Sequence, residues 1–384
     1  MAPPKICLSW APSWLRNTSR AQRLILLALL ALLLLLSSTF YVAHWRWRLK
    51  HSHHYPYRDH WLDVLPLTRE VNITDMLASS PGQWDMFQEL VPELLHAPLP
   101  QTHVCEDSAR FGPILFVGVF SIAKEYEQRA VVRALQTLQS PPSEKVVMRF
   151  ILGRSPNQKL QKLAENEAEM YGDIVFLDIE ENMDDGKTYA YFKWVSGLPV
   201  GEQPRFVLKA DSDTFLVLPA VLDTLSHLSC SQLVYWGTSW GSCLNTCYPF
   251  YQRGMAYGLS WPLVAWLGSA NLPSWATIGM EDVRTGAWFG SLPREAGTLM
   301  VVDLYYHAGN WDGITIPWDR DTVALHSMKQ PEHWARVASK LREIWEENGR
   351  EWRWPPVRTL RERESEALWG ATRDWQRGAV PART

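Results

Sequence analysis

Two aspartates separated by one serine, Asp211-Ser212-Asp213, have the residue types and spacing best suited to metal chemistry. They follow the apolar run RFVLKA, which predicts a buried strand, and precede the apolar run TFLVL. Carboxylates two residues apart beside a strand end can both reach one hard cation, and such a cation can neutralise a phosphate group. Aspartates also stabilise ordinary turns, so a purely structural turn is the alternative interpretation.

A second acidic pair, Glu281 and Asp282, lies in the segment TIGMEDVRTGAWF, whose apolar neighbours predict a largely buried helix start. A carboxylate held there can act as a general base and accept the proton of an attacking hydroxyl group. Acidic residues are also favoured at helix N-termini by the helix dipole, which gives the structural alternative.

Two histidines, His307 in VVDLYYHAGNW and His326 in TVALHSMK, are further candidates. An imidazole that completes a carboxylate site would favour Mn²⁺ over Mg²⁺, because nitrogen ligands suit softer transition metals. A histidine considered alone more often has a structural role.

Regular elements that could position these residues begin at Ile114. Four short apolar runs predict strands: ILFVGVF, VVMRFILG, DIVFLD and RFVLKA. Two helical stretches separate the first three runs, at residues 124–139 and 157–171. This alternation predicts an α/β fold with βαβ units and a mostly parallel central sheet covered on both faces. Ligands of such sheets bind beyond the carboxyl ends of the strands, where Asp211 is expected to lie.

An uncharged run at residues 24–43, LILLALLALLLLLSSTFYVA, is long enough to cross a bilayer as a helix. A cleaved signal peptide is the alternative, but its apolar region is usually shorter and ends in a small-residue cleavage site. Residues 1–23 would then form a cytosolic tail, because a large domain and a glycosylation sequon at Asn72 follow the run. The sequence therefore predicts a single-pass type II anchor.

The remaining chain divides by composition into three parts. Residues 44–112 lack sustained periodicity and are expected to form a stem, residues 113–335 a catalytic domain, and residues 336–384 a charged helix and tail. Four cysteines form an even set that an oxidising lumen could pair, with four free thiols as the alternative. These are Cys105, Cys230, Cys243 and Cys247.

The formal net charge of -3 provides no basic footprint of the kind that nucleic-acid binding usually requires, so no nucleic-acid partner is expected.

Over residues 114–329 the order of these pieces resembles glycosyltransferase family 31, the β-1,3-galactosyltransferase and β-1,3-N-acetylglucosaminyltransferase group. The family's middle aspartate is replaced here by Ser212, and both outer aspartates are kept. The matching blocks are QRAVVR, RFILG with the acidic helix that leads to YGDIVFLD, FVLKADSDTFL, YPFYQRGMAYGLS and GMEDVRTG.

The resemblance implies a GT-A type, Rossmann-like domain that transfers a hexose from a UDP-sugar with inversion. It implies a role for each matching residue. The implied roles are Asp213 as principal metal ligand, Asp211 and Ser212 as donor or metal-water contacts, His326 as a further metal ligand, Asp282 as base with Glu281 in reserve, and Arg129, Arg133 and Lys209 near the donor.

The resemblance further implies Mn²⁺ as cofactor, with Mg²⁺ as the alternative, and a glycan or glycoprotein acceptor that receives a β-1,3 linkage. UDP-galactose is the favoured donor and UDP-N-acetylglucosamine the alternative. With the anchor, it predicts a Golgi membrane protein with a lumenal catalytic domain. Two other classes stay open: a non-catalytic relative that binds glycans or acts as a scaffold, and a metal-dependent hydrolase.

Overall fold

The computed structural model describes eight segments of the chain. They are residues 67–72, 90–99, 112–139, 146–226, 228–239, 251–304, 307–311 and 321–347. The predicted cytosolic tail, the predicted membrane segment at residues 24–43 and four of the five cysteines lie outside these segments. Among the described residues, no helix is both long and apolar enough to cross a bilayer. The fifth cysteine, Cys230, forms a disulfide bond, so the alternative of four free thiols does not hold for it.

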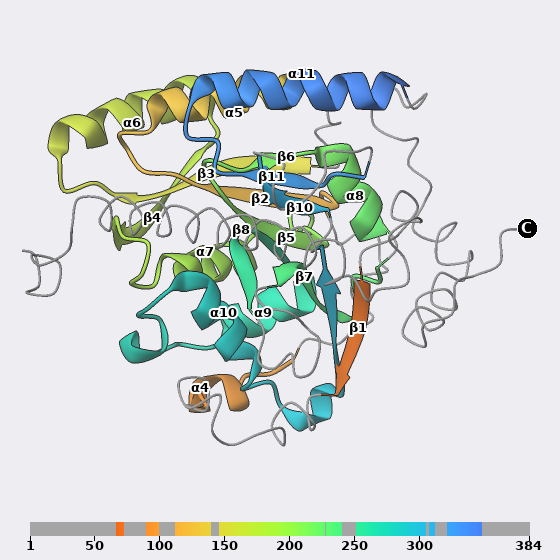
Figure 1. The fold of residues 1–384 in the computed structure, drawn as a ribbon. Coiled ribbons are helices and arrows are strands. Elements are labelled where there is room, and N and C mark those ends of the chain that lie inside the picture. Colours follow the sequence, from red (N-terminus) through yellow and green to blue (C-terminus); the bar gives the residue numbers. More distant parts are fainter. Residues whose placement is uncertain are drawn as a thin grey trace, which may run out of the picture. The chain divides into compact units, whose positions relative to one another are not determined.

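An eight-stranded sheet forms the centre of the domain, with strand order β1-β9-β7-β8-β5-β2-β3-β4 (Figure 1). Strands β5, β2, β3 and β4 are parallel neighbours, and so are β7 and β9, whereas β8 and β1 run antiparallel to their neighbours. The predicted α/β fold with a mostly parallel sheet is therefore confirmed. The strands are β1 Leu67–Asn72, β2 Leu115–Phe120, β3 Val146–Arg154, β4 Ile174–Glu180, β5 Phe206–Asp211, β7 Leu233–Ser239, β8 Gln252–Ser260 and β9 Thr298–Asp303.

Helices cover both faces of this sheet (Figure 1). On one face lie α5 Tyr126–Gln139, α6 Gln158–Tyr171 and α11 Pro331–Glu347. On the other lie α7 Lys187–Ser196, α9 Trp261–Ser269 and α10 Glu281–Phe289. The shorter helices are α4 Pro92–Leu95, α8 Leu218–Ser226, η4 Ser274–Ala276 and η5 Arg294–Ala296.

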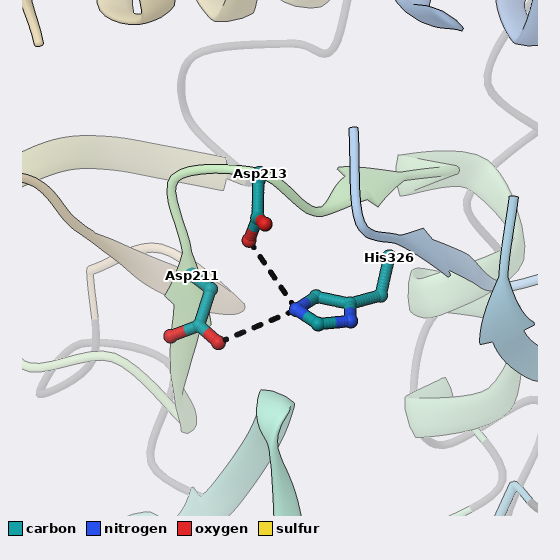
Figure 2. A group of neighbouring side chains, drawn as sticks. All are labelled: Asp211, Asp213 and His326. Carbon is teal, nitrogen blue, oxygen red and sulfur yellow. Dashed lines mark ion pairs between the residues drawn. The ribbon is translucent and has the colours of Figure 1, made fainter. Parts of the chain in front are cut away.

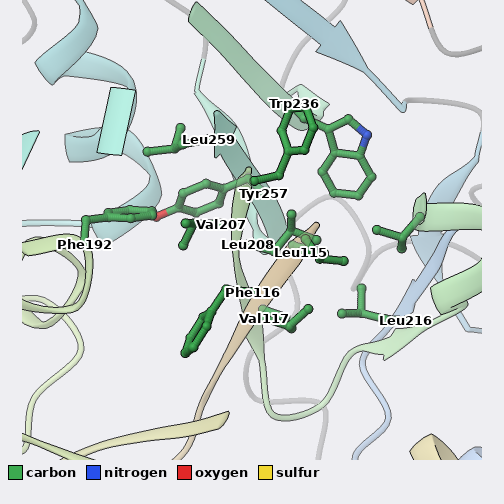
Figure 3. Packing of buried hydrophobic residues seen from close by; sticks show 14 of the residues in the cluster. Leu115, Phe116, Val117, Phe192, Val207, Leu208, Leu216, Trp236, Tyr257 and Leu259 are labelled. Carbon is green, nitrogen blue, oxygen red and sulfur yellow. The ribbon is translucent and has the colours of Figure 1, made fainter. Parts of the chain in front are cut away.

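The sheet core follows from strands that are apolar on both faces. Every residue of β2, with the sequence LFVGVF, is buried, as expected for a central parallel strand between two helical layers. Figure 3 shows side chains of β2 beside those of β5 and β8, with Tyr257 and Trp236 among them. Position 118 of β2 requires glycine, because an added Cβ would come within 2.4 Å of the Tyr191 ring.

The chain path creates a switch point between β2 and β5. From β2 the chain moves outward through α5, β3, α6 and β4, and β5 then returns to the opposite side of β2. The two strands end together, since Phe120 pairs with Asp211 in the parallel register. In open α/β sheets, the carboxyl ends at such a point form the usual ligand crevice. Asp211, the first residue of the Asp211–Asp213 pair, therefore lies at the carboxyl end of β5, as the sequence predicts.

Helix α6 shows how local signals fix an element. The Asn157 side chain accepts hydrogen bonds from the backbone amides of Lys159 and Leu160, at 3.0 and 3.2 Å, and so caps the N-terminus. At the other end Gly172 adopts a left-handed conformation with φ of 66°. The helix predicted at residues 157–171 is thus confirmed.

Two arginines of α5 join this helix to its neighbours. Arg129 is fully buried, and its guanidinium donates to Glu167 of α6 at 2.9 and 2.5 Å and to the Ser121 hydroxyl at 2.9 Å. Arg133 donates to the same Glu167 at 2.7 Å and to Asp173, before β4, at 2.7 and 2.8 Å. Such buried ion pairs are costly to break, because one partner would stay charged without a counter-ion.

Parts of the predicted stem contribute to the main fold. Strand β1 pairs with β9 over its whole length, from Leu67 opposite Asp303 to Asn72 opposite Thr298. In α4, Leu94 is completely buried and its carbonyl accepts a hydrogen bond from the Trp266 indole at 3.1 Å. Residues 67–72 and 90–99 are therefore structural members of the domain.

Helix α11, which begins at Pro331, also has a buried face. Trp334, Val337 and Leu341 are at most 2% exposed. The Trp334 indole donates to the Met328 carbonyl at 2.8 Å. The helix thereby holds the segment that leads away from His326.

Candidate active site

A small sheet brings His326 to the acidic pair. After Asp213, β6 (Phe215–Leu216) pairs antiparallel with β11 (Ala324–His326), and β11 pairs with β10 (Ala308–Asn310). Phe215 lies opposite Leu325, so the next residue along β11 reaches Asp213. Residues more than a hundred positions apart in the chain thus meet through backbone pairing.

Asp211, Asp213 and His326 converge at one point (Figure 2). One ligand atom from each side chain can be chosen such that all lie within 4.8 Å of one another. His326 Nε2 lies 3.3 Å from Asp213 Oδ1 and 3.7 Å from Asp211 Oδ2. Two carboxylates and one imidazole are a donor set that suits a divalent transition metal such as Mn²⁺. The residues fit a cation site.

The orientation of His326 is set by its neighbours. Its Nδ1 lies 3.4 Å from the Asn310 side-chain oxygen and 3.3 Å from the Ser327 hydroxyl, which leaves Nε2 facing the carboxylates. Partners of this kind on the second ring nitrogen fix the ring of a metal-binding histidine. Ser327 has a φ of 68°, a conformation that costs energy for any residue other than glycine and that often occurs at functional sites.

Backbone hydrogen bonds fix the turn that carries the two aspartates. The Asp211 carbonyl accepts from the Thr214 amide at 3.1 Å, and the Asp213 carbonyl accepts from the Met328 amide at 2.9 Å. The Gln128 side chain of α5 donates to the Ser212 carbonyl at 2.9 Å. Ser212 thus contributes to the turn through its backbone.

Lys209 links the two acidic pairs. Its side chain is 1% exposed, and its ammonium lies 2.6 Å from Asp211 Oδ1, 2.5 Å from Glu281 Oε1 and 2.6 Å from the Gly254 carbonyl. Burial alone would lower the pKa of Lys209, but the carboxylates of Asp211 and Glu281 outweigh burial and raise that pKa above its ordinary value. Lys209 therefore stays charged and forms an ion pair with each of the two acids.

Glu281 is enclosed by donors. Besides Lys209, the Tyr257 hydroxyl donates to its Oε2 at 2.8 Å and the Thr188 hydroxyl at 3.1 Å, and the side chain is 9% exposed. Burial raises the pKa of Glu281, and the Lys209 ammonium offsets only part of that effect. These contacts suit a residue that holds the neighbouring side chains in place.

Asp282 is half-buried and keeps fewer partners. Its Oδ2 accepts from the Gly254 amide at 3.0 Å, and its Oδ1 accepts from the Val283 amide at 2.8 Å. Glycine is required at position 254 because an added Cβ would lie 2.6 Å from Glu281 Oε1 and 3.3 Å from Lys209 Nζ. Of the two acids, Asp282 is the better placed to accept a proton.

The pKa of Asp213 lies well below its ordinary value. Burial would raise its pKa, but hydrogen bonds from His326 and Lys329 outweigh burial and lower the pKa to about 2. The carboxylate is therefore ionised at any physiological pH, as a metal ligand must be.

Other predicted residues are not brought to this cluster. Arg129 and Arg133 are engaged with Glu167 of α6 and with Asp173 before β4, and His307 Nδ1 lies 3.2 Å from the Asp321 carbonyl. Conversely, the structure adds Gln128 and Lys329, which the sequence reasoning missed. A local signal for Lys329 was its position three residues after His326, but only the folded chain shows that both contact Asp213.

Residues 127–237 match the galactosyltransferase family model, and the predicted resemblance to this group is thereby confirmed. A hydroxyproline O-galactosyltransferase of Arabidopsis thaliana is 26% identical over 196 residues, which cover 45% of this chain and 28% of that protein. A UDP-GalNAc:β-1,3-N-acetylgalactosaminyltransferase of Xenopus tropicalis is 26% identical over 177 residues, which cover 41% of this chain and 34% of that protein. The chain thus spans about a third of the length of these relatives.

Among solved structures, the galactosyltransferase LgtC in complex with donor and acceptor sugar analogues aligns with 60% of this chain and 99% of its own. The sequence identity is 12% and the TM-score 0.35.

Replacing Lys209 by methionine should lower the free energy of unfolding by about 3 to 5 kcal/mol, because Glu281 would be left buried without its counter-ion. Urea denaturation of the purified full-length protein measures this. Lys162→Met, at a lysine that is 66% exposed, is the matched control and should change stability by less than about 0.5 kcal/mol.

The double variant Lys209→Met/Glu281→Gln should recover part of the lost stability, since it removes the uncompensated charge. Strictly additive effects of the two substitutions would show that the pair is not energetically coupled.

Proposed function

We propose, because residues 127–237 match the galactosyltransferase family, that this chain is an inverting glycosyltransferase. It would transfer a hexose, with galactose favoured, from a UDP-sugar to a hydroxyl group of a glycan or glycoprotein and form a β-1,3 linkage. The observation that carries the proposal is the convergence of Asp211, Asp213 and His326 at the carboxyl end of β5. The proposal includes a GT-A type fold, which the mostly parallel sheet and its switch point support.

The cation of this proposal is Mn²⁺, with Mg²⁺ as the alternative. Asp211, Asp213 and His326 would hold it, and the nitrogen donor supports the transition metal. When bound, such a cation neutralises negative charge on the diphosphate leaving group. Lys209 keeps one oxygen of Asp211 engaged at 2.6 Å, so that the other oxygen, Oδ2, faces His326.

Asp282 is proposed as the base that accepts the proton of the acceptor hydroxyl. The Gly254 amide holds its carboxylate beside the buried Lys209 and Glu281 pair, while the side chain stays half-buried and reachable. Glu281 is better suited to a supporting role, because three side chains already donate to it. Lys209 joins the metal ligands to the helix that carries this base, because it contacts Asp211 and also Glu281, the neighbour of Asp282 in α10.

The names of two relatives support galactose as the favoured sugar. Their names include an O-galactosyltransferase and a β-1,3-N-acetylgalactosaminyltransferase, both of which transfer a galactose-configured sugar.

The purified full-length protein should release UDP from UDP-galactose when Mn²⁺ is present, with water or the hydroxyl group of an added acceptor sugar taking the galactose, and chelation of the metal should abolish the release. UDP-N-acetylglucosamine and UDP-N-acetylgalactosamine complete the donor panel. Asp213→Ala should reduce turnover on the order of 10²-fold or more, because the cation loses a ligand and with it the stabilisation of the leaving group.

Asp178→Ala is the matched control for that experiment, since Asp178 is 95% exposed and distant in the sheet order from β5. It should retain wild-type turnover. A folded protein that is silent across the panel with Mn²⁺ would contradict the transferase proposal and favour a non-catalytic glycan-binding relative.

Asp282→Asn should lower kcat by about 10²- to 10⁴-fold, because an amide cannot accept the acceptor proton. The side-chain oxygen can still accept from the Gly254 amide, so KM for the UDP-sugar should change little. Steady-state kinetics at saturating metal separate the two constants. An unchanged kcat would assign the base to another residue.

A Golgi membrane location with a lumenal catalytic domain is also proposed, on the uncharged run at residues 24–43. A C-terminal tag on the full chain should be protected from protease in intact Golgi vesicles, and deletion of residues 24–43 should abolish membrane association. Digestion of the tag in intact vesicles would exclude this topology.

A further inference from the structure

Lys329 forms an ion pair with Asp213, as Lys209 does with Asp211. Its ammonium contacts Asp213 Oδ2, while Asp213 Oδ1 faces His326 at 3.3 Å. The Lys329 side chain is 68% exposed, whereas that of Asp213 is 12% exposed. A largely solvated lysine thus reaches into a site whose carboxylate is mostly enclosed.

The backbone that carries Lys329 is firmly held. The Met328 amide donates to the Asp213 carbonyl at 2.9 Å, and the Lys329 amide donates to the Ser327 carbonyl at 2.9 Å. On the other side, the Trp334 indole donates to the Met328 carbonyl at 2.8 Å. The base of the Lys329 side chain is therefore fixed beside the cluster, and its exposed four-carbon stem is the part that can change direction.

The two aspartates of the cluster pair with lysines that differ in exposure. Asp211 is paired with Lys209, which is 1% exposed and enclosed by three partners. Asp213 is paired with Lys329, which is exposed and has room to leave. A divalent cation bound by Asp213 would repel the Lys329 ammonium, because like charges a few ångströms apart interact unfavourably. Lys329 is therefore the lysine that can move away from its aspartate when a cation binds.

We propose that Lys329 neutralises Asp213 when no cation is bound and, once a divalent cation replaces it there, turns to the diphosphate of the nucleotide ligand. This inference rests on the proposed function, which supplies both the cation and the diphosphate. A phosphate oxygen is the natural new partner, since an ammonium donates strong charge-assisted hydrogen bonds to phosphate. Lys329 would then oppose binding of the cation alone and favour binding of cation and nucleotide together.

Removal of the Lys329 charge therefore has opposite effects on two affinities. In Lys329→Gln, Mn²⁺ alone should bind about threefold to tenfold more tightly, because its competitor for Asp213 is gone. UDP, in the presence of saturating Mn²⁺, should bind about threefold to tenfold more weakly, because it loses a cationic partner. Titration calorimetry of the purified full-length protein with MnCl₂ and then with UDP measures both without any turnover.

Two further variants control the experiment. Lys340→Gln removes the same charge from α11 at a lysine that is 48% exposed and pairs with Glu343, and it should leave both affinities unchanged. Lys329→Arg keeps the charge and should retain most of the UDP affinity in the presence of Mn²⁺.

The outcomes separate this inference from the proposed function. Wild-type protein that binds neither Mn²⁺ nor UDP would overturn both. Wild-type protein that binds both ligands, with Lys329→Gln unchanged in both affinities, would overturn the role of Lys329 alone. Weaker binding of Mn²⁺ by Lys329→Gln would also overturn it, since a purely supporting lysine predicts that result.

Discussion

The buried ammonium of Lys209 is the constraint on which the candidate site depends. A charge that is 1% exposed must be matched by opposite charge, and here Asp211 and Glu281 supply it at 2.6 and 2.5 Å. The carbonyl of Gly254 accepts a further hydrogen bond from the ammonium at 2.6 Å. Because these partners come from β5, α10 and β8, one side chain sets the spacing between the metal-binding turn and the helix that carries Asp282.

Much of the sheet could be predicted because its signals are local. The runs ILFVGVF, VVMRFILG, DIVFLD and RFVLKA became β2, β3, β4 and β5, since a strand buried on both faces must be apolar throughout. The parallel orientation of β2, β3 and β4 also followed from the two helices predicted between them. The edge of the sheet could not be predicted in this way: β1 pairs with β9, and the short stretch LTREVN carries no local sign of a partner so far along the chain.

The cluster was only partly predictable for the same reason. Asp211 and Asp213 followed from their position after a buried strand. The choice of His326 over His307 as metal ligand depended on the family resemblance, because β6 and β11 are too short to be recognised by pattern. Arg129 and Arg133 show the opposite case. Their types suit a diphosphate, but in the structure they form ion pairs with Glu167 and Asp173. No local pattern in α5 indicates which acids the fold will bring to them.

The two lysines of the site have different roles: one holds the two carboxylates together, and the other leaves room for a cation to bind. Without a cation, Asp211 and Asp213 would repel each other and open the turn between β5 and β6. Permanent neutralisation of both acids would hold the turn closed but leave no charge for a cation to bind. Lys209 is buried, donates to three partners and stabilises the turn in every state. Lys329 is largely exposed and pairs with Asp213, so that a cation can replace it there. Burial thus determines which ion pair is structural and which one can take part in binding.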